Sequence, residues 1–173
     1  MGEVGSAAVY GCGTIGTLVI QWLNAMGVKN LYAIGTREEQ RNLLAGFAEC
    51  TFCNSREKNP VDFIGEQTSG TGVDIVFECV GVKDSINHAV SSARAGGQVV
   101  FVGNPAGDIE FEKQVYWKIL RQQLTIYGTW NSSFTKEKED DWNMTVRAVE
   151  EGKICPAAQI TQRFSFDMLQ DGL

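Results

Sequence analysis

Three glycines near the start of the chain have the spacing of a phosphate-binding loop. The segment Gly11-Cys12-Gly13-Thr14-Ile15-Gly16 follows the short apolar run 7–10 and opens a stretch with helical periodicity. In such a loop the first glycine permits a tight turn, the second lets backbone approach a pyrophosphate, and the third lets helix and strand pack closely. Free N–H groups at the helix start then face the phosphates. The residues that we expect to bind a dinucleotide here are Gly11, Gly13, Thr14, Ile15 and Gly16.

The position that should hold the adenosine ribose departs from the usual pattern. An Asp or Glu that accepts the ribose hydroxyls of NAD is expected about 20 residues after such a loop. Nineteen residues after Gly16 (35 − 16) stands Gly35, followed by Thr36 and Arg37. Gly35 removes a carboxylate that would repel a 2′-phosphate and leaves room for it. Thr36 offers a hydroxyl and a backbone N–H at a helix N-terminus, and Arg37 supplies a fork suited to phosphate. These three residues predict NADP as cofactor, with NAD as the alternative.

Apolar runs and helical patterns alternate along the chain. The predicted strands are 7–10, 30–34, 49–53, 73–79, 98–102 and 124–129, and helical patterns separate or follow them. This alternation predicts an α/β Rossmann fold, a doubly wound six-stranded parallel sheet in the order 3-2-1-4-5-6 with helices on both faces. Thr36 and Glu39 have the pattern of a capping box. The apolar stripe expected on the first helix is Ile15, Leu18, Val19, Trp22, Leu23 and Met26, and the inner face expected on the last is Trp142, Thr145, Val146 and Val149.

Composition excludes several classes of partner. The 173-residue chain has a formal net charge of −6, which does not favour binding to nucleic acid or to an anionic membrane. No apolar run approaches the ~18 residues of a membrane helix, and no signal peptide is recognisable. We therefore expect no nucleic acid or membrane partner, and a cytoplasmic location in which the five cysteines are reduced thiols.

Four segments carry a resemblance to a known family. They are VYGCGTIGTLVIQWLNAMG, GVDIVFECVG, AGGQVVFVG and ILRQQLTIYGTWNSSF. They resemble the coenzyme domain of the zinc-dependent medium-chain alcohol dehydrogenases, most closely the polyol dehydrogenases of the galactitol-1-phosphate and sorbitol type. The resemblance implies an oxidoreductase that transfers hydride between nicotinamide and a polyol or sugar alcohol, phosphorylated or not. The run Gly35-Thr36-Arg37 is similar to that of the NADP-specific members.

The same resemblance implies how the chain is organised. In that family this domain is inserted between two pieces of a catalytic domain that carries the zinc. Residues 1–156 would then be the NAD(P)-binding domain, and 157–173 the start of the return to an absent catalytic domain. We expect this chain alone to be inactive, with zinc bound only in that other domain.

By the same resemblance, three strand ends complete the cofactor site. The residues are Cys79, Val80 and Gly81 after the fourth strand, Val102, Gly103 and Asn104 after the fifth, and Thr129, Trp130 and Asn131 after the sixth. The first group should lie against the adenosine and nicotinamide riboses, the second should line the nicotinamide side, and the third should lie nearby. An independent argument is that ligands bind beyond the carboxyl ends of parallel strands.

No catalytic or metal-binding set is recognisable in the sequence. A catalytic zinc takes three protein ligands and keeps an open position. The chain has a single histidine, His88, and the CxxC of Cys50 and Cys53 lacks a second pair at zinc-finger spacing. We expect both cysteines to be small core residues and Glu78 to have a structural role. The prediction is therefore no catalytic residue and no metal ligand in this chain.

Two other functions remain open at this point. A methyltransferase has a similar glycine loop, although it would normally keep an acidic residue where Gly35 stands. A binding module could sense a nucleotide without chemistry. A short-chain reductase is excluded because it needs Tyr-x-x-x-Lys, and no tyrosine of this chain has a lysine four residues later.

The segment 124–130 predicts self-association. It should be the edge of the sheet, and it is apolar, β-prone and free of proline and charge, so it lacks the usual protection against pairing with another chain. We expect a homodimer that extends the sheet across a two-fold axis. The alternative is a monomer in which residues after Asn131 fold back over the edge.

Overall fold

A single parallel sheet organises the chain in the computed structural model, which describes residues 4–136 and 139–172. Its strand order is β3-β2-β1-β4-β5-β6, and every neighbouring pair is parallel. The strands are β1 (Ser6–Tyr10), β2 (Asn30–Gly35), β3 (Thr51–Asn54), β4 (Val73–Glu78), β5 (Ala93–Phe101) and β6 (Thr125–Gly128). The predicted fold class and strand order are confirmed.

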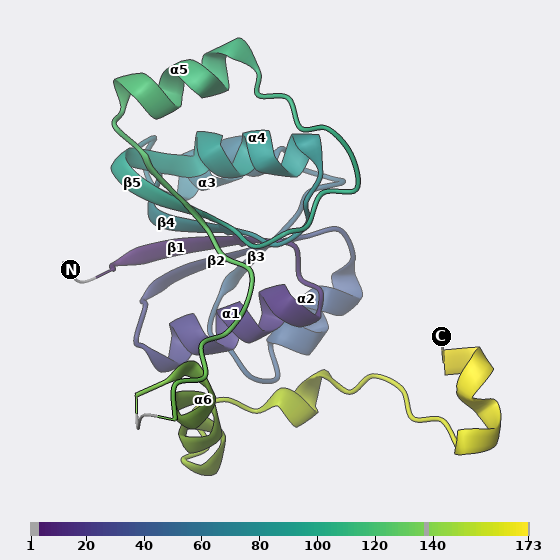
Figure 1. Cartoon of the computed structure of the whole chain (residues 1–173). Helices are drawn as coiled ribbons and strands as arrows, with labels where there is room; N and C mark the ends of the chain where they lie inside the picture. The colour runs from purple at the N-terminus through teal and green to yellow at the C-terminus, as the bar shows by residue number, and fades with distance from the viewer. Residues whose placement is uncertain (1–3, 137–138, 173) are drawn as a thin grey trace.

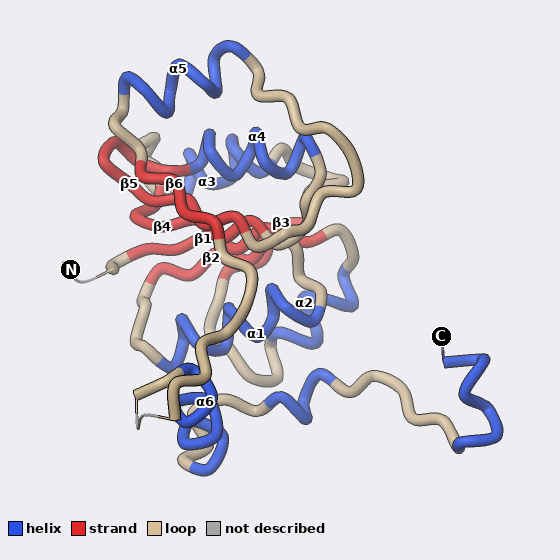
Figure 2. The backbone as a smooth tube through the Cα atoms, in the orientation of Figure 1, coloured by secondary structure: helices blue, strands red, loops and turns tan. Residues whose placement is uncertain are grey.

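Helices cover both faces of this sheet (Figures 1 and 2). They are α1 (Thr14–Ala25), α2 (Glu38–Leu44), α3 (Pro60–Gln67), α4 (Lys83–Ser92), α5 (Lys113–Arg121) and α6 (Asp141–Glu150), followed by the short 3-10 helices η1 (Pro156–Gln159) and η2 (Phe166–Gly172). In Figure 1, α3, α4 and α5 lie on one side of the sheet, and α1, α2 and α6 lie on the other. Among the described residues, no helix combines the length and apolarity needed to cross a bilayer.

Two apolar cores hold the layers together. On the α1–α2 side, Ile20 and Leu23 pack with Val9, Leu44 and Phe52. The α3–α5 side forms a second cluster, made by Tyr32, Phe63, Ile64, Val76, Ala89, Val90, Val99 and Val115 among others. The central strands are buried on both faces, as expected for parallel strands. Both cores therefore fix the position of the strand ends where the predicted site lies.

The buried face of α1 differs from the predicted apolar stripe. Ile15 and Met26 are exposed, whereas Thr17 and Gln21 are buried. Both polar side chains find partners: Thr17 Oγ1 donates to the carbonyl of Gly13 (2.8 Å), and Gln21 hydrogen-bonds to the backbone of Cys155. Because these bonds satisfy the polar groups, the helix can turn a partly polar face inward, which apolar periodicity alone does not predict.

The predicted inner face of α6 is also wrong. Trp142, Val146 and Val149 are exposed, and Ala148 is the buried residue of this helix. The helix lies at the periphery of the α1 side (Figure 1). Apolar spacing correctly indicated a helix, but it did not indicate which face the rest of this chain would cover.

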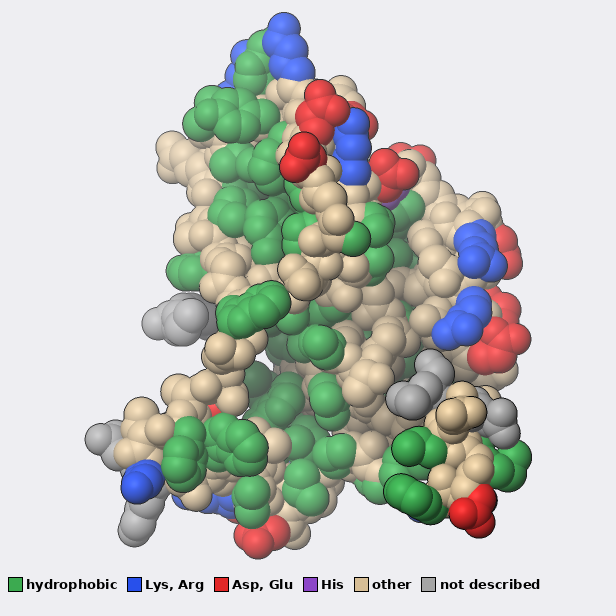
Figure 3. Space-filling view, turned by 45° about the vertical axis from the view of Figure 1, so that its right-hand side comes forward, with side chains coloured by type: hydrophobic (Ala, Val, Ile, Leu, Met, Phe, Trp, Pro, Cys, Tyr) green, Lys and Arg blue, Asp and Glu red, His purple; other side chains and the backbone are tan. Residues whose placement is uncertain are grey.

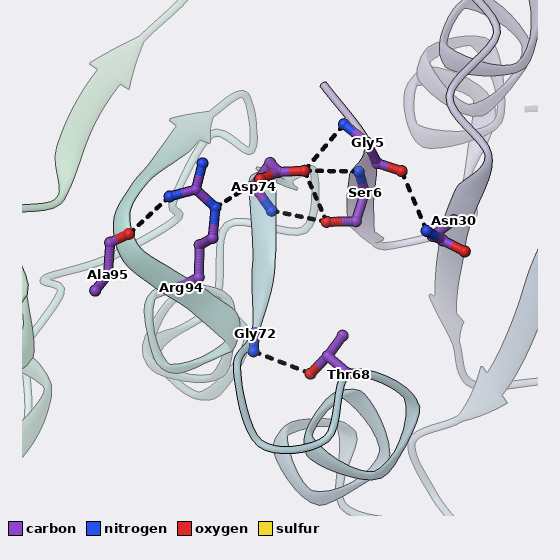
Figure 4. A network of polar contacts seen from close by, with 8 residues as sticks. All are labelled: Gly5, Ser6, Asn30, Thr68, Gly72, Asp74, Arg94 and Ala95. Carbon is purple, nitrogen blue, oxygen red and sulfur yellow. Dashed lines mark hydrogen bonds and ion pairs between the residues drawn. The ribbon is translucent and has the colours of Figure 1, made fainter. Parts of the chain in front are cut away.

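A polar network ties together the amino ends of the strands (Figure 4). The carboxylate of Asp74 accepts from the backbone N–H groups of Gly5 (3.0 Å) and Ser6 (2.8 Å) and from the Ser6 hydroxyl, and it pairs with Arg94. Burial alone would raise the pKa of Asp74, but the hydrogen bonds from Arg94 and Ser6 outweigh it and lower that pKa below its usual value. This end of the sheet is closed by the protein's own groups.

Candidate functional site

The glycine loop joins the end of β1 to the start of α1 at the middle of the sheet. Gly11 has φ +94°, and a Cβ there would lie 2.7 Å from Val80 Cγ2. A Cβ at Gly16 would lie 1.7 Å from the carbonyl oxygen of Gly11, so helix and turn are in direct contact. A Cβ at Gly13, by contrast, would meet no protein atom within 4 Å. Two glycines thus shape the loop, and the third leaves open space beside it.

The start of α1 faces this open space. Gly13 is the N-cap residue, and no side chain caps the helix. Gly13, Thr14 and Ile15 are exposed, while Gly16 and Thr17 are buried behind them. The first N–H groups of a helix have no partner within the helix, and they carry a partial positive charge. The arrangement suits an anionic group placed over the loop.

The turn after β2 is more crowded than the sequence indicated. Gly35 is buried, and a Cβ there would lie 2.6 Å from Gln40 Oε1 and 2.7 Å from Phe52 Cε2. The expectation that Gly35 leaves room was therefore wrong, because a carboxamide and an aromatic ring fill the space beside it. A side chain at this position would need both neighbours to move.

The helix start after that turn also differs from the prediction. The N-cap is Arg37 rather than Thr36, and α2 has seven residues. The backbone N–H groups of Thr36 and Arg37 both donate to Gln40 Oε1, at 2.9 and 3.1 Å. The glutamine or glutamate whose side chain reaches back to the turn is thus Gln40, not the predicted Glu39. The Thr36 N–H, which was expected to face an anion, already has Gln40 as its partner. What remains exposed at the turn are the side chains of Thr36 and Arg37.

Arg37 lies with the glycine loop at one cavity. The cavity has a volume of about 430 Å³, and its lining residues are Cys12, Gly13, Thr14, Thr17, Arg37, Glu39, Gln40, Leu43, Gln159 and Thr161. Arg41, one turn further along α2, pairs with Glu38 (Nε–Oε2 2.8 Å). Within the described part of the chain, Arg37 has no acidic partner at ion-pair distance. Its charge is therefore available to an anion at the cavity.

The turns after β4 and β5 are pressed against each other. Gly81 has φ +80°, and a Cβ there would lie 2.8 Å from the carbonyl of Asn104. A Cβ at Gly103 would lie 2.3 Å from the N–H nitrogen of Gly81. The structure therefore brings together the predicted residues of these two turns, and Val80 extends the contact to Gly11.

A buried carboxylate organises these two turns. Glu78 is fully buried, and its side chain accepts from the N–H groups of Val80 (2.8 Å) and Gly81 (3.0 Å) and from the Ser85 hydroxyl (2.6 Å). Its carbonyl oxygen accepts from the N–H groups of Val102 and Gly103. A buried charge needs partners of this kind. The expected structural role of Glu78 thus has a specific form, which is to hold both turns in place.

The residues after β6 are less closely tied to the site. The Thr129 N–H donates to the Phe101 carbonyl (3.1 Å), which places this strand end beside that of β5. Thr129, Trp130 and Asn131 are exposed. Among the described residues, no hydrogen bond joins Trp130 or Asn131 to the glycine loop. The structure thus brings together the predicted residues on β1, β2, β4 and β5 more closely than those on β6.

The cysteines near the loop have raised thiol pKa values. Burial raises the pKa of Cys12 to about 12, and burial together with the Glu78 charge raises that of Cys79 to about 12. Cys53 is buried and Cys50 half-buried, and both belong to or pack against the apolar clusters. Across residues 4–136 and 139–172, no group of three His, Cys, Asp or Glu side chains could hold a metal ion.

Comparison with known families decides the class of this fold. The sequence profile of zinc-binding dehydrogenases matches residues 14–151. The chain belongs to the zinc-binding dehydrogenase family. This confirms the family resemblance found in the sequence.

Two relatives of this chain are named as dehydrogenases of galactitol 1-phosphate and of butanediol. Galactitol 1-phosphate 5-dehydrogenase of Escherichia coli K12 is 28% identical over 159 residues, which cover 92% of this chain and 46% of the relative. The (R,R)-butanediol dehydrogenase of Bacillus subtilis strain 168 is 36% identical over 96 residues, covering 56% of this chain and 28% of the relative. The chain spans about half the length, or less, of these curated relatives.

Solved structures of zinc-binding dehydrogenases share the fold. Galactitol-1-phosphate dehydrogenase from Escherichia coli superposes with a TM-score of 0.85 at 27% identity, over 98% of this chain and 49% of that one. A zinc-binding dehydrogenase from Sinorhizobium meliloti 1021, bound to NADP, also gives 0.85, at 24% identity, over 98% and 48%. The likeness extends over nearly the whole chain described here.

Sequence reasoning missed Gln40, the residue that joins the two halves of this candidate site. Its Nε2 donates to the Cys12 carbonyl in the glycine loop (3.1 Å), while its Oε1 holds the β2–α2 turn. The available signal was a glutamine in the first turn of α2, the place from which a side chain reaches back to the preceding backbone. The pattern of Thr36 and Glu39 predicted the capping box one residue earlier than it occurs.

Proposed function

We propose that this chain is the coenzyme-binding part of a zinc-dependent oxidoreductase that transfers hydride between NADP(H) and a polyol or sugar alcohol. The observation that carries the proposal is the meeting of an uncapped glycine loop and an unpaired Arg37 at one cavity. Family membership supports a dehydrogenase over the methyltransferase and over a module without chemistry. The names of the relatives support a polyol or diol as substrate, and the substrate can be phosphorylated, as in galactitol 1-phosphate.

The residues present fit a nicotinamide dinucleotide. The open side of Gly13 allows a pyrophosphate to approach the backbone, and the first N–H groups of α1, at Thr14 and Ile15, would bind it. The packed turns at Val80–Gly81 and Gly103–Asn104 would hold the nicotinamide riboside beyond the carboxyl ends of β4 and β5. When bound, the nicotinamide ring would supply the hydride chemistry. The role of this chain would be to bind the dinucleotide and to orient its nicotinamide ring.

Preference for NADP(H) over NAD(H) rests on position 35 and its neighbour Arg37. A buried glycine provides no carboxylate against a 2′-phosphate, and among residues 4–136 and 139–172 the guanidinium of Arg37 has no acid at ion-pair distance. Hydrogen bonds to charged groups contribute about 1.5–3 kcal/mol each. Two such bonds from Arg37 would give a preference on the order of 100-fold or more.

Titration with NADPH and NADH, followed by nucleotide fluorescence, tests this proposal. We expect the native chain to bind NADPH more tightly, and Arg37→Ala to weaken NADPH by about 10- to 100-fold with little effect on NADH. Arg41→Ala is the matched control, because it removes the same charge four residues further along the chain, at a residue already paired with Glu38. Equal affinities in the native chain, or an equal effect of both variants, would contradict the preference.

The catalytic zinc is proposed to lie in another part of the protein. The described residues offer no cluster of ligands for it, so no step is assigned to it in this chain. We propose that residues 1–156 are the NAD(P)-binding domain and that 157–173 lead toward the domain that carries the zinc. A cytoplasmic location is proposed with them.

A homodimer through the edge strand is the proposed assembly. β6 lies at the edge of the sheet and pairs with β5, and Tyr127 and Trp130 remain exposed beside that edge. Figure 3 shows hydrophobic side chains spread over the face turned toward the viewer. Ile126 packs against the α3–α5 core, so changing it would disturb the fold as well as the edge. An exposed residue of the strand is a better probe.

Tyr127→Lys is therefore the variant that tests the dimer. We expect the native chain to sediment as a dimer at micromolar concentration and Tyr127→Lys as a monomer, because a charge on the edge opposes strand pairing. Tyr116→Lys is the control, since Tyr116 is also exposed but lies on α5. A monomeric native chain, or a Tyr127→Lys dimer, would refute this interface.

A further inference from the structure

One side chain connects the two turns that the nucleotide would span. The carboxamide of Gln40 accepts from the N–H groups of Thr36 and Arg37 at 2.9 and 3.1 Å, and it donates to the carbonyl of Cys12 at 3.1 Å. Cys12 lies within the glycine loop, and Arg37 lies at the start of α2. The two parts of the site are thus fastened to each other by Gln40.

The same carboxamide occupies the place from which an acidic side chain would act. Gln40 Oε1 lies 2.6 Å from the position that a Cβ of residue 35 would take. A neutral group therefore stands where dehydrogenases that use NAD carry a carboxylate on the strand end. It also leaves no vacant space in which residue 35 could carry one, because Phe52 closes the other side.

We propose that Gln40 is a positioning residue for cofactor selectivity, which keeps the site neutral beside Gly35 and presents Arg37 to a 2′-phosphate on the adenosine ribose. This inference rests on the proposed preference for NADP(H). It does not require an anion site at the start of α2, because the N–H groups of Thr36 and Arg37 bond to Gln40 itself. The positive charge comes from the Arg37 side chain.

The geometry explains how Gln40 would act through Arg37. Its two accepted bonds hold Arg37 in an extended conformation (φ −144°, ψ 140°) before the helix begins. Its donated bond sets the distance between that turn and the glycine loop. Side-chain entropy opposes a fixed guanidinium, so a backbone already held in position lowers the cost of binding phosphate.

Two substitutions at Gln40 separate these roles. Gln40→Met keeps the length of the side chain and removes all three hydrogen bonds. Gln40→Glu keeps the acceptor for Thr36 and Arg37, and it places a carboxylate beside position 35 without adding an atom to the crowded space. Gln67→Glu is the matched control, because it makes the same charge change on the exposed surface of α3, across the sheet.

The experiment measures the ratio of the dissociation constants for NADH and NADPH in the native chain and the three variants. We expect Gln40→Met to lower this ratio about tenfold, the value of one net hydrogen bond. Gln40→Glu should lower it by about 100-fold, since a negative charge then faces the 2′-phosphate. Gln67→Glu should leave it unchanged.

The outcomes distinguish this inference from the proposed function beneath it. A native chain without preference for NADPH would overturn both the inference and the proposed preference for NADP(H). This result comes from the native chain alone and needs no variant. A native preference that survives both Gln40 variants would overturn the inference alone. A purely structural role would weaken both coenzymes equally and leave the ratio unchanged, which would also overturn it. Thermal melts identify a variant that fails to fold, and the other Gln40 variant then decides.

Discussion

The two ends of the sheet are built in opposite ways. At the amino ends, Asp74 collects N–H and hydroxyl donors from Ser6 and Gly5 and pairs with Arg94. At the carboxyl ends, Gly13 and Thr14 are exposed, and the helix behind them has no side-chain cap. The first end satisfies its own polar groups, and the second leaves donors facing outward.

The glycines at the two ends of the sheet differ in the same way. A Cβ at Gly72, near the amino end of β4, would lie 2.7 Å from the Ser92 carbonyl, whereas one at Gly13 would meet nothing within 4 Å. Crowding by the protein's own backbone indicates a structural glycine. Open space alone does not indicate a ligand, because Gly27 and Gly65 have it too, but at Gly13 it lies at the start of a helix without a side-chain cap. Neighbouring glycines of a single motif can therefore have different purposes, as Gly16 and Gly13 do.

Substitution of these two glycines should give the largest contrast. Gly16→Ala places a methyl group 1.7 Å from the Gly11 carbonyl oxygen, so the loop must rearrange. We expect it to destabilise the fold by about 3 kcal/mol or more and to abolish nucleotide binding. Gly13→Ala meets no protein atom and has an allowed backbone (φ −83°). It should keep its melting temperature and still lose dinucleotide affinity.

Thermal melts and NADPH titration of both variants check this contrast. Comparable melting temperatures for the two alanine variants would show that the loop is not as tightly packed at Gly16 as its geometry indicates. Unchanged NADPH affinity in Gly13→Ala would show that the open side of the loop is not where a pyrophosphate binds.

Gly35→Asp should have the next largest effect, and it should act on folding first. Its Cβ would lie within 2.7 Å of both Gln40 Oε1 and Phe52 Cε2. We expect a loss of about 1–3 kcal/mol, a fall in melting temperature of roughly 2–12 °C, and weaker binding of both coenzymes. Gly35→Ala separates sterics from charge, because it has the same Cβ without the carboxylate. An aspartate variant with native stability and a simple switch to NADH would contradict this account.

Asp74→Asn should have a smaller effect, confined to stability at the opposite end of the sheet. Because the pKa of Asp74 is lower in the folded state, its contribution is fully present above the unfolded value of about 4 and is lost as pH falls through the folded value. We expect Asp74→Asn to cost about 1–2 kcal/mol at pH 7 and much less at pH 3. Nucleotide affinity at pH 7 should not change.

Melting temperatures of the native chain and Asp74→Asn across this pH range test the sign of the effect. A gap between them that widens below pH 4 would contradict it. A change in NADPH affinity would show that the two ends of the sheet are not as independent as their contacts indicate.

The sequence was sufficient for the features that repeat or follow from spacing. Alternating apolar and helical patterns predicted the sheet order. The glycine spacing predicted a tight turn at Gly11 and close packing of helix and strand at Gly16, which agree with the contacts there, while the pyrophosphate role of Gly13 stays a prediction. It was less informative about faces. Thr17 and Gln21 are buried because their polar groups find backbone partners, and no pattern of apolarity contains that information.

The contacts inside the site could not be predicted from the sequence for a similar reason. The absence of a carboxylate at Gly35 was visible, but the group that fills its place comes from Gln40, five residues later, through a side chain that folds back. The convergence of Gly81 with Gly103 likewise joins two turns that are distant in the chain. Contacts of this kind depend on how strands are set side by side, which only the folded chain specifies.

The central position of β1 also constrains the order in which the chain can fold. β1 pairs with β2 on one side and with β4 on the other, and Ser6 meets Asp74 across 68 residues of sequence. As the chain emerges from the ribosome, its first strand must wait for β4 before its second edge is covered. Pairing over such separations closes slowly, and the open edge is exposed in the meantime. The glycine loop that follows β1 therefore reaches its final shape late, since Gly11 packs against Val80 just after β4.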